Sequence, residues 1–381
     1  MKKLLISALI LAYGLGAGAQ EKKTVTLPSW VNDVKLSGYA MTQYSYTDEE
    51  GAKANSFNLR LIRLSLDGRV ANDFYWKLQF QANGNTANQG GSPRIVDAFA
   101  EWQKYDFARI KVGQFKRAFT FENPMHPITE GFYTYAQAIN KLAGMSDRTN
   151  EHSSNGRDIG VQLQGDFLKN SNGRNLLHYQ IGVYNGQGIN KKDVDQQKDI
   201  IGGLWVMPVK GMRIGAFGWT GSYARKGKWT EINATTGDEE AHEGTRKLQK
   251  RRYAFSAEYL TNDWTFRTEY IHSTGYAFAK SANDKENESN ANINAALGDK
   301  ADAYYAAVIA PVIKKKLYAK ARYDLYRSTA EWNSARSLYE VGMNYEFNKN
   351  IQVNFEYAFV NDRNKADKNS NMIDVQLDFK F

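Results

Sequence analysis

The chain has 381 residues, and its 50 lysines and arginines exceed its 41 aspartates and glutamates, so its formal charge is +9. It has no cysteine, which excludes a disulfide framework, cysteine-based metal sites and thiol catalysis. Its aromatic content of 13% is more apolar surface than a disordered chain leaves in water. Past the N-terminus no apolar run approaches the roughly 18–20 residues of a spanning helix. The mean hydropathy of −0.60 still allows a transmembrane β-barrel, because alternating strands average to a hydrophilic value.

The N-terminus has the pattern of an export signal. Lys2 and Lys3 precede an apolar stretch over residues 4–15, and residues 17–19 (Ala-Gly-Ala) suit cleavage. We expect a signal peptide over residues 1–19, a periplasmic segment over residues 20–33 and a barrel domain over residues 34–381. A membrane anchor is the alternative for the N-terminus, and the short apolar stretch argues against it.

From about residue 34 onward, apolar and polar side chains alternate in successive stretches. The pattern is clearest in residues 74–81, 351–359 and 373–381, and it requires strands with two chemically different faces. The sequence predicts an all-β transmembrane antiparallel barrel. It has about sixteen strands, these three included, and each is long enough to cross a bilayer when tilted. The other strands are expected near residues 34–46, 57–68, 95–105, 107–116, 157–168, 176–184, 198–208, 212–223, 251–260, 264–278, 301–311, 317–326 and 337–347.

Short and long connections alternate between these predicted strands. Outer-membrane barrels have this rhythm because their periplasmic turns are short and their extracellular loops are long. The tight turns are residues 71–72, 105–106, 209–211, 261–263 and 348–350. The longer polar links, which we expect to be loops, are residues 48–55, 83–93, 185–197, 224–250, 279–300, 327–336 and 361–370.

The apolar face is rich in aromatic residues near the strand ends. A soluble β-sandwich or soluble barrel would also alternate, but its apolar face would consist mainly of Val, Leu and Ile. Aromatic residues at strand ends favour the two headgroup girdles of a membrane barrel. The residues that we assign to these girdles are Trp76, Trp102, Trp205, Trp264, Tyr179 and Tyr339.

The polar face carries many ionisable residues of both signs. In a dry core such groups cost several kcal/mol each unless they are paired, whereas a barrel of about sixteen strands encloses an aqueous channel. We therefore expect a wet lumen and permeation, with many of the charges paired across strands. Basic members of this face are Arg109, Lys111, Lys320 and Arg322, and acidic members include Asp97, Glu101, Glu340, Glu346 and Glu356.

The connection between Lys116 and Asn155 is unlike the others. It spans roughly forty residues, which is far above ordinary loop lengths. It carries too many apolar residues to stay solvated, among them Phe119, Phe121 and Phe132. We expect this third long loop to fold inward and narrow the lumen, and residues 134–145 suit a short helix.

Four segments carry a resemblance to a known family. They are residues 60–68 (RLIRLSLDG), 113–119 (GQFKRAF), 157–161 (RDIGV) and 182–186 (GVYNG). Together they resemble the phosphate-selective porin O and P family of Gram-negative outer membranes. The resemblance implies a sixteen-stranded trimeric porin, integral to the outer membrane, with a basic constriction that favours anions.

The family's basic motif positions fall on Arg60, Arg63, Lys116 and Arg117. Arginine's planar fork suits phosphate oxygens, and a ring or ladder of cations is the expected selectivity device of an anion pore. In strict alternation Arg60 and Arg63 point to opposite faces, so we expect only one of them in the lumen unless a bulge intervenes. The complete set of pore-lining candidates is Arg60, Arg63, Lys116, Arg117, Arg109, Lys111, Lys320 and Arg322. The acidic residues of the same face leave a mild charge bias as the alternative to strict phosphate selection.

Catalysis finds little support in the sequence. The five histidines have no metal-ligand spacing, and no nucleophile-elbow or phosphate-loop motif is present. We expect no catalytic residue, metal or cofactor, and no nucleic-acid partner for an exported protein. The expected partners are small anions such as phosphate, outer-membrane lipids and further copies of the chain. The alternative is a structural or interaction barrel of an outer-membrane complex that conducts little.

Overall fold

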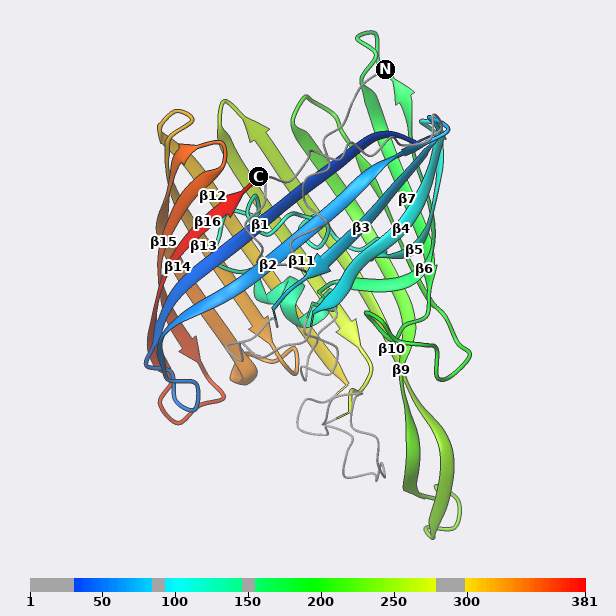
Figure 1. Cartoon of the computed structure of the whole chain (residues 1–381). Coiled ribbons are helices and arrows are strands. Elements are labelled where there is room, and N and C mark those ends of the chain that lie inside the picture. Colours follow the sequence, from blue (N-terminus) through cyan, green and yellow to red (C-terminus); the bar gives the residue numbers. More distant parts are fainter. Residues whose placement is uncertain (1–30, 84–92, 146–154, 279–298) are drawn as a thin grey trace, which may run out of the picture.

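The computed structural model describes residues 31–83, 93–145, 155–278 and 299–381; the expected signal peptide lies outside them. In this part of the chain sixteen antiparallel strands form one closed barrel, and each strand pairs with its neighbours in sequence (Figure 1). The predicted fold class is confirmed. The strands are β1 (Val31–Thr47), β2 (Ala54–Val70), β3 (Phe74–Gln81), β4 (Arg94–Tyr105), β5 (Ala108–Lys116), β6 (Arg157–Lys169), β7 (Asn175–Tyr184), β8 (Asp199–Val206), β9 (Met212–Ile232), β10 (Glu239–Thr261), β11 (Trp264–Thr274), β12 (Lys300–Ile313), β13 (Leu317–Arg327), β14 (Ala335–Asn348), β15 (Ile351–Asp362) and β16 (Asn369–Lys380).

The barrel closes between β1 and β16, where Tyr39 lies opposite Lys380 and Thr47 lies opposite Met372. Phe381 extends this pairing, because its N–H donates to the carbonyl of Gly38 over 3.0 Å and its own carbonyl accepts from the N–H of Gly38 over 3.1 Å. A Cβ at Gly38 would lie 2.6 Å from the Phe381 ring and 2.9 Å from the backbone carbonyl oxygen of Arg63. Only glycine therefore fits beneath the last side chain of the barrel.

We predict that deletion of Phe381 lowers the amount of assembled barrel several-fold. The deletion removes both hydrogen bonds to Gly38 and the outermost residue of the apolar row on β16, so it weakens the seam that closes the sheet. The measurement is the fraction of outer-membrane protein that migrates faster unheated than boiled on a detergent gel. Replacement of Phe381 by Tyr, which keeps the backbone bonds and the ring, is the control. Wild-type amounts of the fast-migrating form in the deletion variant would contradict the prediction.

The outward face of the barrel is apolar, as the alternation predicts. Large hydrophobic side chains are exposed on it around the whole circumference, for example Val112, Ile181, Ile214, Phe255, Val341 and Leu377. Near the long-loop end, aromatic rings of adjacent strands contact each other in a row: Tyr323 lies 5.2 Å from Tyr339, which lies 6.3 Å from Phe359. Such rows are typical of the girdle at a headgroup boundary.

Trp205 does not belong to a girdle, so that sequence-based assignment was wrong. On β8 the outward positions are taken by Ile200, Leu204 and Val206, and Trp205 points inward between them. Its ring stacks on His178 at 3.9 Å and meets Phe121 of the long loop at 5.4 Å. An indole suits either environment, and only the register of β8 decides between them.

The segment 224–250 is a β-ribbon, and the prediction of a polar loop was wrong. β8 pairs with β9 only up to Thr220, and β11 pairs with β10 only from Arg251 onward. Beyond these residues β9 and β10 pair with each other as far as Ile232 and Glu239, and the hairpin projects past the barrel (Figure 1). Tyr223, Ala224 and Lys250 at its base are buried, but most described residues farther out are exposed on both faces and need no apolar alternation, which is why the pattern failed to reveal the ribbon. The other strand ends lie within four residues of the predicted ones.

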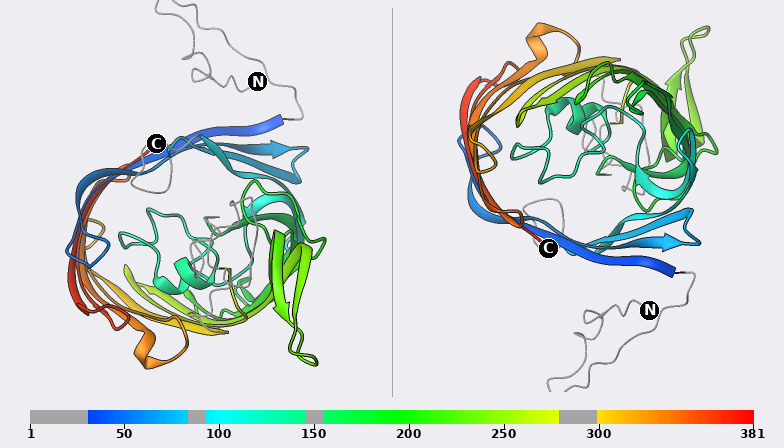
Figure 2. Two further views of the ribbon diagram at one scale, coloured as in Figure 1. Left: turned by 90° about the horizontal axis from the view of Figure 1, so that it is seen from below. Right: turned by 90° about the horizontal axis from the view of Figure 1, so that it is seen from above.

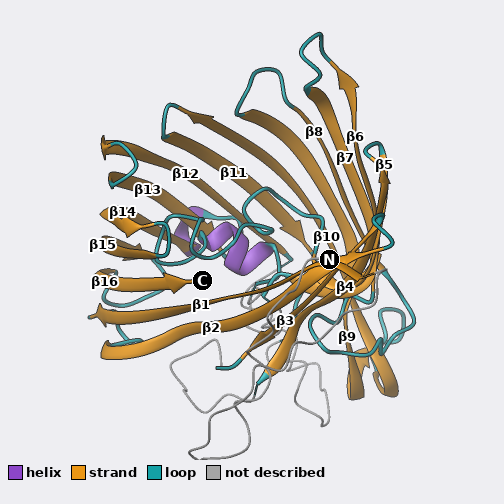
Figure 3. Ribbon diagram, turned by 45° about the horizontal axis from the view of Figure 1, so that its top comes forward, coloured by secondary structure: helices purple, strands orange, loops and turns teal. Residues whose placement is uncertain are grey.

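Residues 117–145, the described part of the connection that follows β5, lie inside the barrel (Figure 2), and we call them the inner loop. Its short helical segment η1 (Ala138–Leu142) is the helix drawn inside the sheet in Figure 3. The ring centroids of Phe119 and Trp219 lie 5.4 Å apart, as do those of Phe121 and Phe217, so the loop packs against β9. Ile139 and Leu142 of η1 are fully buried in the same cluster. Among the described residues, no helix is long and apolar enough to cross a membrane.

Candidate functional site

Polar side chains of the wall fasten the inner loop to one side of the lumen. Arg322 of β13 donates to the carbonyl of Thr134 over 3.1 Å from each of Nη1 and Nη2 and pairs with Glu130 at 3.3 Å. Lys320 donates to the carbonyl of Gly131 over 2.8 Å. Glu269 of β11 accepts the N–H groups of Phe121 and Glu122 over 2.8 and 2.9 Å. These contacts hold the loop against β11 and β13.

Two cavities lie beside the inner loop and share part of their lining. The outer cavity has a volume of about 670 Å³ and reaches the long-loop end, where Glu49 and Asn364 line it. The inner cavity has a volume of about 300 Å³ and extends along β5 to β7, where Lys111 and Gln180 line it. The two cavities share four lining residues: Arg63, Lys116, Pro127 and Arg157. We call these four residues the junction.

Arg63 of β2 reaches the junction from the wall. It is only 3% exposed, and its partners are neutral. Its Nε donates to Oε1 of Gln81 over 2.8 Å, and its Nη1 donates to the hydroxyl of Tyr39 over 2.9 Å. These two bonds orient the guanidinium without neutralising its charge.

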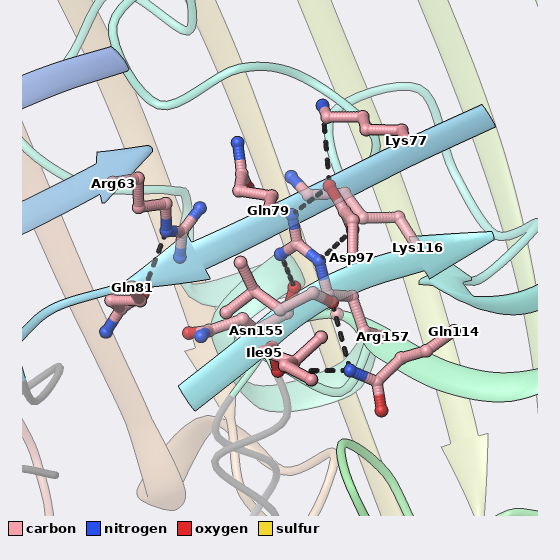
Figure 4. A network of polar contacts seen from close by, with 12 residues as sticks. Arg63, Lys77, Gln79, Gln81, Ile95, Asp97, Gln114, Lys116, Asn155 and Arg157 are labelled. Atoms are coloured by element: carbon pink, nitrogen blue, oxygen red, sulfur yellow. Dashed lines mark hydrogen bonds and ion pairs between the residues drawn. The ribbon is translucent and has the colours of Figure 1, made fainter. Parts of the chain in front are cut away.

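Lys116 and Arg157 end β5 and begin β6, and they lie directly opposite each other in the sheet. Lys116 Nζ donates to the carbonyls of Asn123 and Met125, over 2.7 Å in each case. Arg157 is paired with Asp97, with Nε 2.5 Å from Oδ1. Figure 4 shows Arg157 and Lys77 directed at this carboxylate, with Lys77 at 3.4 Å, and Arg63 directed at Gln81.

Arg60 also lines the outer cavity, so both Arg60 and Arg63 face the lumen. The expectation that only one of them would do so was wrong for a physical reason. The pairing of β1 with β2 shifts between Met41 and Thr42, which face Leu61 and Leu59. Arg60 is the extra residue of this β-bulge, and a bulge moves the following side chains to the other face. Its Nη1 donates to Oε1 of Gln376 over 2.6 Å.

The other predicted pore-lining residues are engaged with the wall or the loop. Lys111 lines the inner cavity, 3.8 Å from Glu101. Arg117 lies at the edge of the same cavity but is buried in an ion pair with Asp158 at 3.2 Å. Arg109 pairs with Asp166 at 2.6 Å outside both cavities. Lys320 and Arg322 are likewise outside both cavities, where Lys320 pairs with Glu356 at 2.7 Å and Arg322 with Glu340.

The charges around the two cavities are unequally partnered. Within the described residues, no carboxylate oxygen lies within 4 Å of the side-chain nitrogens of Arg60, Arg63 or Lys116. Three of the four carboxylates of the outer cavity do have cations: Arg336 pairs with Glu49 at 2.7 Å and with Asp362 at 3.6 Å, and Glu340 pairs with Arg322. The fourth, Asp324, accepts the N–H of Gln137 over 2.8 Å. The passage therefore carries a surplus of positive charge at and just above the junction.

His126 of the inner loop is buried near the same cations. Burial and the nearby positive charges of Lys116 and Arg63 lower its pKa to about 4. The ring therefore stays neutral near pH 7, and His126 adds no positive charge to the junction.

Residues 36–184, which run from within β1 to the end of β7 and include the inner loop, match the family model described as phosphate-selective porin O and P. The resemblance to this porin family is confirmed. The family match, the closed sixteen-stranded sheet and the apolar outward face together identify an outer-membrane porin barrel. The long loops accordingly mark the extracellular end and the short turns the periplasmic end.

Solved structures of other porins share the fold. An anion-selective porin from Comamonas acidovorans has a TM-score of 0.62 at 13% identity over 92% of this chain and 100% of that chain. OmpF of Salmonella typhi, in complex with daunomycin, has a TM-score of 0.61 at 14% identity over 92% of this chain and 98% of that chain. OmpT of Vibrio cholerae, described as a trimer form, has a TM-score of 0.57 at 13% identity over 92% of this chain and 99% of that chain. No curated protein sequence matches the chain.

Sequence reasoning did not assign three cations of the passage: Arg157, Lys77 and Arg336. Arg157 opens the segment 157–161 that carries part of the family resemblance, so a signal existed at that position. Nothing in the sequence indicates that β6 places it opposite Lys116. Among the described residues, no group of three or more His, Asp or Glu side chains could hold a metal ion.

Proposed function

We propose that this porin is a diffusion channel that prefers small anions, phosphate among them, and that the junction sets the preference. The observation that carries the proposal is that three of the four residues shared by the two cavities are cations. A solute that passes from one cavity to the other must pass Arg63, Lys116 and Arg157. Preorganised cations at a narrow point raise the local concentration of anions and repel cations.

The arrangement suits phosphate in particular. Arginine presents parallel N–H groups to two oxygens of one anion, whereas lysine acts as a point charge. Arg63 uses only Nε and Nη1 for the wall, and Nη2 has no hydrogen bond within the described part of the chain. This amino group and Arg60 just above it would give a phosphate two successive contacts on the way in.

The proposal extends to assembly and excludes catalysis. The trimer form of OmpT supports a homotrimer, and the apolar outward face suits outer-membrane lipids as the surrounding medium. The acidic and basic groups of the lumen named above hold the loop, line a cavity or pair with each other on the wall, and we propose no enzymatic activity. A structural barrel would not need Arg63 and Lys116, which have no carboxylate partner in the part of the chain that the structure describes, at the point where two cavities meet.

We predict an anion-selective reversal potential for the purified porin in a planar bilayer. With a dilute KCl gradient the unpaired cations are screened least, because the Debye length is about 10 Å at 0.1 M salt and longer below it. The preference for chloride should fall as the salt concentration on both sides is raised. A cation-selective potential would contradict the proposal, and the absence of any conductance from correctly folded protein would favour the structural barrel.

A further inference from the structure

The outer cavity is larger and more apolar than inorganic phosphate requires. Its volume is about 670 Å³, which lies within the range of roughly 300–1,000 Å³ typical of small-molecule pockets. Beside the cations, its lining includes the apolar or aromatic side chains of Leu61, Tyr133, Tyr135, Met145 and Leu338. A small hydrated anion has no surface that these side chains can contact favourably.

The apolar and the cationic linings meet at the junction. Lys116 Nζ lies 5.1 Å from the centre of the Tyr135 ring and donates to its hydroxyl over 3.2 Å. The Tyr135 hydroxyl in turn donates to the carbonyl of Met125 over 2.7 Å, so its polar end is used by the loop. Leu61 follows Arg60 on β2 and faces the same cavity because of the bulge. An anionic head at the junction would therefore have aromatic and aliphatic side chains next to its body.

We infer that the outer cavity is a binding vestibule for small organic anions that carry a planar or apolar body, such as an aryl phosphate. The head group lies between Arg60, Arg63 and Lys116, and the body covers Tyr133, Tyr135 and Leu61. The inference rests on the proposed anion preference and adds the class of solute. Apolar contact of the body with the tyrosines removes hydrated apolar surface from water, which favours binding. Contacts between the ring of the solute and the tyrosine rings add to the free energy of binding.

Current block by two phosphate monoesters of equal charge tests this inference. In a planar bilayer in dilute KCl, at a pH where both esters are dianions, phenyl phosphate should block the chloride current at a concentration roughly tenfold lower than methyl phosphate. The charges of the two probes are the same, so the ratio measures the contact of the body alone. Equal blocking concentrations in an anion-selective channel would overturn the vestibule and leave the proposed function intact. Loss of anion selectivity itself would instead overturn the proposed function.

Tyr133→Ser links the effect to the cavity. Tyr133 is partly exposed and lines the outer cavity without contributing charge, so the variant should bring the phenyl-to-methyl ratio below about threefold and keep the wild-type reversal potential. Tyr276→Ser is the matched control, because Tyr276 is exposed and lines neither cavity. An unchanged ratio in the folded Tyr133→Ser channel would overturn the assignment of the body to this surface. The comparison of the two esters on the wild-type channel decides the inference even if the variant does not assemble.

Discussion

Replacement of Arg63 by Gln should lower the preference of the channel for chloride over potassium by roughly twofold to tenfold. A unit charge about 4 Å from an ion contributes about 1 kcal/mol in water and about 4 kcal/mol at an effective dielectric of 20. A net change of about 1.4 kcal/mol corresponds to a tenfold change in occupancy. The Gln side chain still offers a hydrogen bond near Gln81 and Tyr39, so the change removes charge with little effect on the wall. The measurement is the reversal potential in a dilute KCl gradient.

Arg109→Gln is the matched control for this variant. Arg109 faces the lumen from β5 but lies outside both cavities, and Asp166 neutralises it at 2.6 Å. Its replacement should leave the reversal potential unchanged, because an already paired charge far from the junction contributes little to the local field. If both variants shift the potential equally, the total charge of the lumen sets selectivity and the junction has no special role. An unchanged potential in Arg63→Gln would remove Arg63 from the site.

Lys116 and Arg117 are less suitable for this test although the sequence favours both. Lys116 holds the carbonyls of Asn123 and Met125, and Arg117 is buried against Asp158. Reversal of either charge places a carboxylate among acceptors inside the loop interface. Such a variant would change loop position and selectivity together, and the two effects could not be separated.

The alternation of side chains was sufficient to predict the barrel but not the site. Strands such as β3 and β16 show the period of two because lipid and lumen impose different chemistry on their faces. The junction combines Arg63 of β2 with Lys116 and Arg157 of β5 and β6, and their proximity depends on strand register and on the path of the inner loop. Neither leaves a local pattern in the sequence. The bulge at Arg60 is likewise visible only in the pairing of β1 with β2.

Charged residues on the lumen face could be found from the sequence, whereas their roles could not. Lys320 and Arg322 carry the same alternating pattern as Lys111, yet they bind the loop and Lys111 lines the inner cavity. The difference arises because the inner loop contacts β13 at Lys320 and Arg322, whereas its contacts with β5 are at Lys116 and not at Lys111. A basic residue on the inner face is therefore equally compatible with a pore lining and with a structural contact until the loop is placed.

Replacement of Arg322 by Ala should release the loop and produce frequent brief closures of the channel. Arg322 binds the Thr134 carbonyl, Glu130 and Glu340 from a side chain that is almost fully buried. Removal of one partner of a buried ion pair costs roughly 3–5 kcal/mol, because the remaining carboxylates stay buried without a counter-charge. The segment around Glu130 then leaves the wall of β13, and the space into which it moves is the passage itself. The measurement is the frequency of closures in single-channel recordings at low voltage.

The control separates loop release from damage to the barrel. Arg109→Ala breaks an arginine–aspartate pair of the wall that does not touch the loop, so it should leave both the open current and the closures at wild-type values. Heat-dependent migration on a detergent gel establishes that both variants form barrels. Closures appear in Arg322→Ala because the wall no longer balances the charge of Glu130, so the double variant Arg322→Ala with Glu130→Gln should show fewer of them. A wild-type closure frequency in a folded Arg322→Ala channel would mean that Glu269, Lys320 and the apolar contacts of η1 hold the loop without Arg322.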